Sequence, residues 1–373
     1  MLAPALMLFA GGASTGVLLC LLTLTLFQRL RVRTNVLTQS RPFAAASQAA
    51  HPSQRKHPSV QWLHVLLRRS ALFLALLLAY GLFASFASAQ TTLQRVDPVV
   101  FSALQLSLLL PLGLGILGLS VRTSARGSIR LGFIGGFPLG IGFVGVALSL
   151  HALGIIPTAM LTALDGLMAS LMSWLVFRQH LSMYTCLATI CASGGAILLW
   201  WVAPSQWQPD LVALACGLAF TLYAFHVERH LGVLEAFRQQ LLPFFGGLFC
   251  SMAITALALA LCFGKWGGVQ AMTLGDLEVL LYCGLATVLI PQVILTILLR
   301  HIGAVTLAFF AVLEPLISLG FAYWWGKISL NLFGWCGVIL ILLSIILQAY
   351  ASRRPTSSTQ TPSEASESES AHS

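Results

Sequence analysis

Two acidic residues lie deep inside apolar stretches of this 373-residue chain, at matching positions in its two halves. Asp165 follows Gly154 by eleven residues, and Glu314 follows Gly303 by the same interval. A carboxylate in hydrocarbon costs about 2.5–3.5 kcal/mol on insertion scales, so such a residue is a functional candidate by default. The duplication predicts a transporter built from two related halves.

Each acid has three candidate roles. Asp165 and Glu314 could bind a cationic group of a substrate, carry a coupling proton, or accept hydrogen bonds from backbone freed at Gly166 and Pro315. Gln292 follows a helix-kinking proline, so it could hydrogen-bond either a substrate or a neighbouring helix. We take these three side chains as the substrate and proton candidates.

Aromatic residues are candidates for lining a cavity: Tyr80, Tyr223, Tyr323 and Trp324. Aromatic side chains near helix ends also anchor proteins at the membrane interface, and Trp324 fits that role better. Close helix packing is predicted by a separate set of residues at four-residue spacing: Gly132, Gly136 and Gly140.

The composition identifies a membrane protein. Hydrophobic residues make up 58% of the chain and charged residues 8%, with a mean hydropathy of +0.89. Soluble globular proteins carry about 25% charged residues. Stretches of about 20 apolar residues, long enough to cross a bilayer as a helix, occur near 5–28, 70–92, 99–120, 130–150, 154–177, 182–203, 209–228, 241–263, 277–299, 303–325 and 331–351. The expected fold class is therefore all-α and polytopic.

The net charge of +9 reflects topology rather than a nucleic-acid partner. With the basic run after the first segment placed in the cytoplasm, all but three of the 20 Lys and Arg fall on that side. The exceptions are Arg95, Lys265 and Lys327. We expect the N-terminus outside, the C-terminus in the cytoplasm, and a bacterial inner membrane with anionic headgroups around the protein.

The segments divide the chain into parts. The expected parts are an extra N-terminal transmembrane helix (1–29), a basic cytoplasmic linker (30–69), two five-helix repeats (70–203 and 209–351) and a disordered cytoplasmic tail (352–373). An odd number of crossings per repeat inserts the second repeat upside down relative to the first. This predicts a ten-helix inverted repeat with its site between the halves.

The second repeat resembles a known family. Residues 304–319 (AVTLAFFAVLEPLISL), 324–330 (WWGKISL) and 334–340 (GWCGVIL) are similar to the closing helices of the EamA domain of the drug/metabolite transporter superfamily. Repeat one follows the same order more weakly, with Leu164-Asp165-Gly166 in place of the acid-proline element. The resemblance implies a secondary transporter that exports or exchanges small metabolites such as amino acids by alternating access. The glutamate that the family has in the turn before its last helix is Gln179 in repeat one and Lys327 in repeat two. The resemblance therefore does not identify the substrate.

Other functions fit the sequence less well. A lipid or polyprenyl-carrier translocator would use the same fold. An intramembrane aspartyl protease would need a Gly-x-Gly-Asp element, which is missing, and a membrane sensor would need a soluble signalling domain. The eight cysteines form no Cys-x-x-Cys pair. We therefore expect no enzymatic activity, cofactor or metal, and a small-molecule substrate with H+ as a possible coupling ion.

Overall fold

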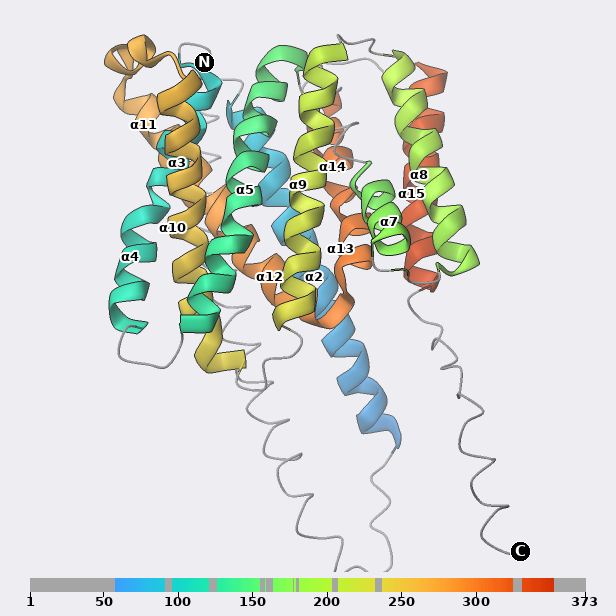
Figure 1. Ribbon diagram of the computed structural model, residues 1–373. Helices are drawn as coiled ribbons and strands as arrows, with labels where there is room; N and C mark the ends of the chain where they lie inside the picture. Colours follow the sequence, from blue (N-terminus) through green and yellow to red (C-terminus); the bar gives the residue numbers. More distant parts are fainter. Residues whose placement is uncertain are drawn as a thin grey trace, which may run out of the picture.

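A computed structural model describes residues 58–90, 96–120, 126–154, 158, 164–176, 178, 181–202, 207–231, 237–324 and 331–351. Every element in these ranges is helical, and the helices stand together in one bundle (Figure 1). The extra helix expected within 1–29 and the tail expected at 352–373 lie outside the described residues, as does the 30–57 part of the expected linker. Residues 58–69, also expected as linker, are helical instead.

The first half of the bundle contains α2 (Pro58–Gln90), α3 (Pro98–Ser107), α4 (Leu109–Ser120), α5 (Arg126–Leu153), α7 (Asp165–Leu175) and α8 (Met183–Val202). The helix α2 begins twelve residues before the segment expected at 70–92. Proline is favoured at the first helical position because its fixed backbone angle suits a helix start. The apolar run therefore marks the membrane part of this helix and not its beginning.

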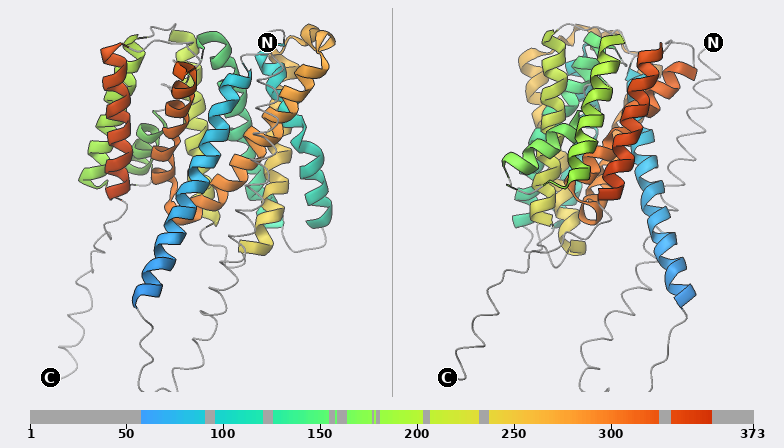
Figure 2. Two further views of the ribbon diagram at one scale, coloured as in Figure 1. Left: turned by 180° about the vertical axis from the view of Figure 1, so that it is seen from behind. Right: turned by 90° about the vertical axis from the view of Figure 1, so that its right-hand side faces the viewer.

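The second half contains α9 (Trp207–Leu231), α10 (Phe237–Phe263), η1 (Trp266–Ala271), α11 (Leu274–Leu281), the π-helix η2 (Tyr282–Leu289), α12 (Ile290–Ile302), α13 (Ala304–Ala311), α14 (Leu313–Trp324) and α15 (Leu332–Ala351). The first residues of α2 and the last of α15 lie at the same end of the bundle (Figure 2).

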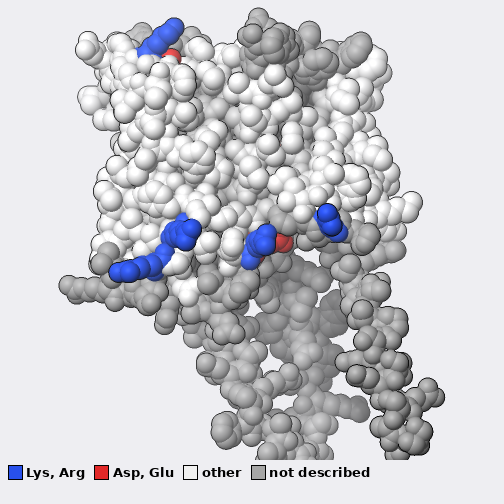
Figure 3. Space-filling view, in the orientation of Figure 1, with Lys and Arg blue, Asp and Glu red and all other residues white. Residues whose placement is uncertain are grey.

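The described helices are suited to a bilayer. Six spans are long and apolar enough to cross one: Pro98–Ser120, Arg126–Leu153, Leu211–His230, Gln240–Phe263, Leu274–Leu299 and Leu332–Ala351. Shorter apolar helices cover Ser70–Phe86, Met183–Leu198 and Ala304–Gly320. On the face in Figure 3 the charged side chains lie near the two ends, with an uncharged band between them. The chain is an integral membrane protein.

Prolines interrupt three segments that the sequence predicts as continuous helices. The α3–α4 break at Leu108 precedes Pro111 by three residues, and the α13–α14 break at Val312 precedes Pro315 by three. Proline has no N–H for the carbonyl four residues earlier, and its ring crowds that carbonyl. Pro291 follows η2, where wider π-helical turns accommodate the same defect.

Two glycines turn the chain in the same way in both halves. Gly154 ends α5 with a φ of 82°, and Gly303 ends α12 with a φ of 76°. The N–H of Gly154 donates to the Leu150 carbonyl, and that of Gly303 to the Leu299 carbonyl, each over 3.0 Å. A positive φ suits glycine because it has no Cβ. These two turns determine where the segments that carry Asp165 and Glu314 begin.

The close contact between α5 and α10 depends on small side chains. Gly132, Gly136 and Gly140 lie on the face of α5 that meets α10. A Cβ at Gly136 would lie 2.5 Å from the Leu248 carbonyl oxygen and 2.7 Å from the Ser251 Cβ. The backbones of the two helices therefore approach more closely than any larger residue would allow.

Gly136→Ala should destabilise this contact. The added methyl must displace α10 backbone, and overpacking of this kind costs about 1–3 kcal/mol. We expect a lower midpoint of thermal unfolding for the purified protein in detergent. Gly115→Ala in α4 is the matched control, because no described atom lies within 4 Å of a Cβ there. Equal midpoints for the two variants would contradict the packing described here.

Candidate functional site

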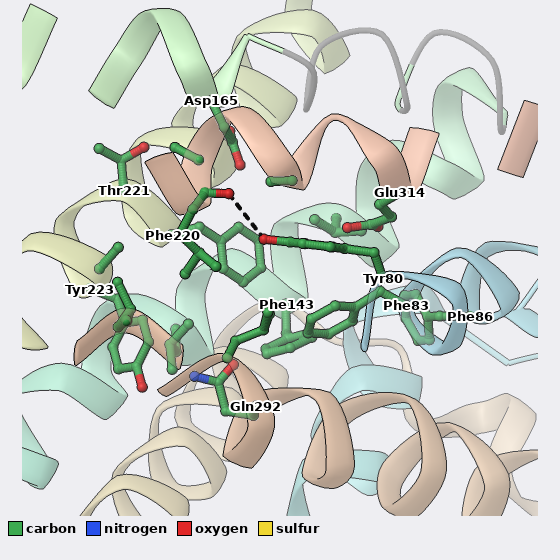
Figure 4. A pocket seen from close by; sticks show the side chains of 18 residues that line it. Tyr80, Phe83, Phe86, Phe143, Asp165, Phe220, Thr221, Tyr223, Gln292 and Glu314 are labelled. Carbon is green, nitrogen blue, oxygen red and sulfur yellow. Dashed lines mark hydrogen bonds between the residues drawn. The ribbon is translucent and has the colours of Figure 1, made fainter. Parts of the chain in front are cut away.

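A cavity of about 100 Å³ lies between the two halves of the bundle. A buried water needs roughly 10–15 Å³, so the space admits several waters or part of a small organic molecule. Its walls come from α2, α5 and α7 of the first half and from α9, α12, α13 and α14 of the second (Figure 4). The lining residues are Tyr80, Phe83, Phe86, Leu139, Phe143, Val146, Asp165, Phe220, Thr221, Tyr223, Ala224, Gln292, Leu295, Leu299, Leu307, Ala308, Ala311 and Glu314.

The structure brings both intramembrane acids to this cavity. Asp165 is the first residue of α7, and Glu314 lies in the first turn of α14. Each therefore sits where a helix begins, and the partial positive charge of a helix N-terminus favours an anion there. The two carboxyls are close enough to influence each other electrostatically. Both carboxyls also lie close enough to the Tyr80 hydroxyl to affect it electrostatically.

Two tyrosines of the lining make hydrogen bonds: Tyr80 joins the two halves, and Tyr223 links two helices of the second half. The Tyr80 hydroxyl of α2 donates a hydrogen bond of 3.1 Å to the Leu307 carbonyl of α13 (Figure 4). On α9, the Tyr223 hydroxyl lies 2.6 Å from the Thr296 Oγ1, which itself donates to the Gln292 carbonyl over 2.6 Å. Because the Thr296 proton is used in that second bond, Tyr223 is the donor to Thr296. This chain links α9 to α12 beside Gln292.

The remaining lining is aromatic and apolar. The Phe143 ring packs edge to face on Phe220 with centroids 5.3 Å apart, and it lies 6.0 Å from the Phe83 ring. Neither lysine nor arginine is among the described lining residues. The two carboxyls are therefore the only ionisable groups of the described lining apart from the tyrosines.

Asp165 has an orphaned oxygen. Its side chain is 8% exposed, and its Oδ1 accepts no hydrogen bond from the described residues. This oxygen lies against the backbone of α9 at Gly217, where a Cβ would collide with it. Buried polar atoms are normally paired, so an exception calls for an unseen partner such as water, a proton or a ligand.

A third acid, Glu228, makes a hydrogen bond near the Gly303 turn. The Glu228 carboxylate of α9 accepts a hydrogen bond of 3.1 Å from the N–H of Ala304, the first residue of α13. The first N–H groups of a helix lack partners within the helix, and a carboxylate satisfies one of them. Glu228 thus connects the first helix of the second half to the segment that carries Glu314.

Most of the site residues that the sequence predicts lie at the cavity. Asp165, Glu314, Gln292, Tyr80 and Tyr223 all line the cavity. The side chains of Tyr323 and Trp324 lie outside the described residues. Sequence reasoning missed the other thirteen lining residues, among them Phe143, Phe220 and Thr221, and it missed the contact of Gly217 with Asp165. Only Gly217 carried a signal, because a glycine inside a helical apolar stretch often marks a close approach.

Comparisons with known proteins agree with this architecture. Residues 210–350 match the model of the EamA-like transporter family. This match agrees with the resemblance that the sequence of the second half shows. A solved structure described as the crystal structure of a protein shares the fold, with a TM-score of 0.58 and 17% identity over 77% of this chain and 100% of the other. Comparison with curated proteins gives no match.

The contact between Gly217 and Asp165 can be tested by a double-mutant cycle. Only Asp165 atoms lie within 4 Å of a Cβ at Gly217 among the described residues. Gly217→Ala should therefore cost about 1–3 kcal/mol in the wild-type protein through overpacking. In an Asp165→Ala background the same change should cost little, because the colliding oxygen is absent. Thermal unfolding in detergent measures both effects, and equal losses in the two backgrounds would refute the contact.

Proposed function

We propose that the protein is a secondary transporter of small metabolites that works by alternating access between two inverted five-helix repeats. The observation that carries this proposal is the composition of the cavity wall. The first, third and fourth segments of each repeat line it: α2, α5 and α7 from one half, and α9, α12, α13 and α14 from the other. Transporters with inverted repeats bind substrate at such an interface, near discontinuous helices.

Several features support the inverted repeat itself. The glycine turns, the helix starts and the acids recur at the same interval in both halves. Helix contacts recur with the halves exchanged: α5 packs on α9 as α12 packs on α2, and α7 meets α9 as α14 meets α2. The pairs α8 with α15 and α7 with α13 join equivalent segments. A pseudo-two-fold axis between the repeats accounts for all of these pairings.

The charge distribution supports an orientation. Four described arginines, Arg126, Arg130, Arg178 and Arg229, lie beside the start of α5, the start of α8 or the end of α9. Those helix ends are at the lower end of the bundle in Figure 1, whereas Lys265 follows α10 at the upper end. By the positive-inside rule the lower end is cytoplasmic. We therefore propose a cytoplasmic C-terminus and opposite orientations of the two halves in a bacterial inner membrane.

Asp165 and Glu314 are the proposed substrate and proton carriers, with Gln292 as a polar contact. Two carboxyls in an apolar cavity are costly as anions unless a positive charge joins them. Binding a proton or a cationic group offsets that cost, and release on the other side restores it. This exchange would couple substrate movement to H+ without any cofactor.

A comparison of metabolites released by cells tests the proposal. Cells that overproduce the wild-type protein should release at least one small metabolite faster than cells that lack it. Glu314→Gln should insert normally but lose most of this effect, at least tenfold, because the amide cannot exchange a proton. Asp165→Asn should lose less, because Gly166 breaks its helix less rigidly than Pro315 does.

The matched control is Glu278→Gln, which neutralises an exposed acid of α11 outside the cavity. It should release metabolites as the wild type does. Full activity of an Asp165→Asn/Glu314→Gln double variant would reduce both acids to structural residues. An identical metabolite profile with and without the wild-type protein would contradict transport altogether.

A further inference from the structure

We propose that the cavity binds an organic ammonium compound: a protonated amine with an aromatic or other apolar body and no carboxylate. This inference rests on the proposed transport function and specifies the substrate class of the same cavity. It follows from the charge of the lining, the arrangement of the aromatic rings and the unpartnered oxygen of Asp165.

The charge of the lining selects against anions. Asp165 and Glu314 contribute two carboxyls that act on each other, and no lysine or arginine balances them among the described lining residues. A substrate carboxylate would add a third negative group where little water screens it. An ammonium group would instead offset the carboxyls. A zwitterionic amino acid gains at one end and loses at the other, so a simple amine fits better.

The aromatic rings suit the rest of such a ligand. Phe143 and Phe220 meet edge to face, and Phe83 lies beside Phe143, so the rings form a continuous apolar wall from both halves. Figure 4 shows Phe143 and Phe83 on one side of the Tyr80 ring and the two acids on the other side of that ring. Ring faces attract cations, and apolar walls bury the body of a ligand. The amine end therefore lies toward the acids and the body toward the phenylalanines.

The third observation is the unpartnered oxygen. Asp165 Oδ1 is buried and accepts no hydrogen bond within the described structure. An ammonium group has only donors, whereas this oxygen is an acceptor in the ionised form. Thr221 Oγ1 lines the same cavity, also without a partner among described residues, and can bind a neutral polar group on the ligand.

Three matched compounds test the proposal on the purified full-length protein. 2-Phenylethylamine is protonated at pH 7, phenylalanine adds a carboxylate to it, and 3-phenylpropionate carries the carboxylate alone. We expect 2-phenylethylamine to raise the midpoint of thermal unfolding in a saturable manner. Phenylalanine and 3-phenylpropionate should bind at least tenfold more weakly.

Variants then assign the binding to the cavity. Asp165→Asn and Glu314→Gln should each weaken 2-phenylethylamine binding at least tenfold, and Glu278→Gln should leave it unchanged. Stronger binding of phenylalanine or 3-phenylpropionate, binding insensitive to both variants, or no binding of the amine would each overturn the inference. The comparison of the three compounds on the wild-type protein tests the inference even if a variant fails to fold. Metabolite release that depends on Glu314 without amine binding would sink this inference and leave the proposed transport function standing.

Discussion

The cost of charge in an apolar interior is the constraint on which the rest of the structure depends. Asp165 and Glu314 cannot sit as free anions in hydrocarbon, so each lies at the start of a helix and both line a cavity. The interrupted helices that achieve this expose backbone groups, which the membrane itself cannot satisfy. Neighbouring helices do so instead: Glu228 of α9 accepts a hydrogen bond from the first N–H of α13.

The two ends of the bundle are joined by different side-chain hydrogen bonds. At one end Glu228 satisfies the first N–H of α13, while Gln90, at the end of α2, donates to the Ala147 carbonyl of α5 over 3.2 Å. A charged acceptor makes a stronger hydrogen bond than a neutral amide does. In the proposed alternating-access cycle such contacts would break in turn, and a difference in their strength would bias the resting state.

The sequence predicted an all-helical membrane protein, but not the features that tertiary contacts decide. From the matched spacing of acids and glycines we expect Asp165 and Glu314 in the central part of the bundle, and both residues line the cavity. Pro315 was a signal for the α13–α14 break, because proline removes a helix hydrogen bond. Pro291 removes one too, but the sequence does not tell whether the helix breaks or widens into the π-helix that precedes this residue, since packing decides between them. Phe143 and Phe220 carry no local signal, because apolar residues are equally common on lipid-facing and cavity-facing sides.

The proposed transport function requires that one cavity between the halves opens to both sides of the membrane. Ala308 lines this cavity and is 8% exposed, so a cysteine there reports on access with little disturbance. With the eight native cysteines replaced, Ala308→Cys can be labelled by a membrane-impermeant thiol reagent in sealed vesicles of either orientation. The account predicts labelling from both sides, slowed by a bound ligand. Labelling from one side only, under every condition, would contradict it.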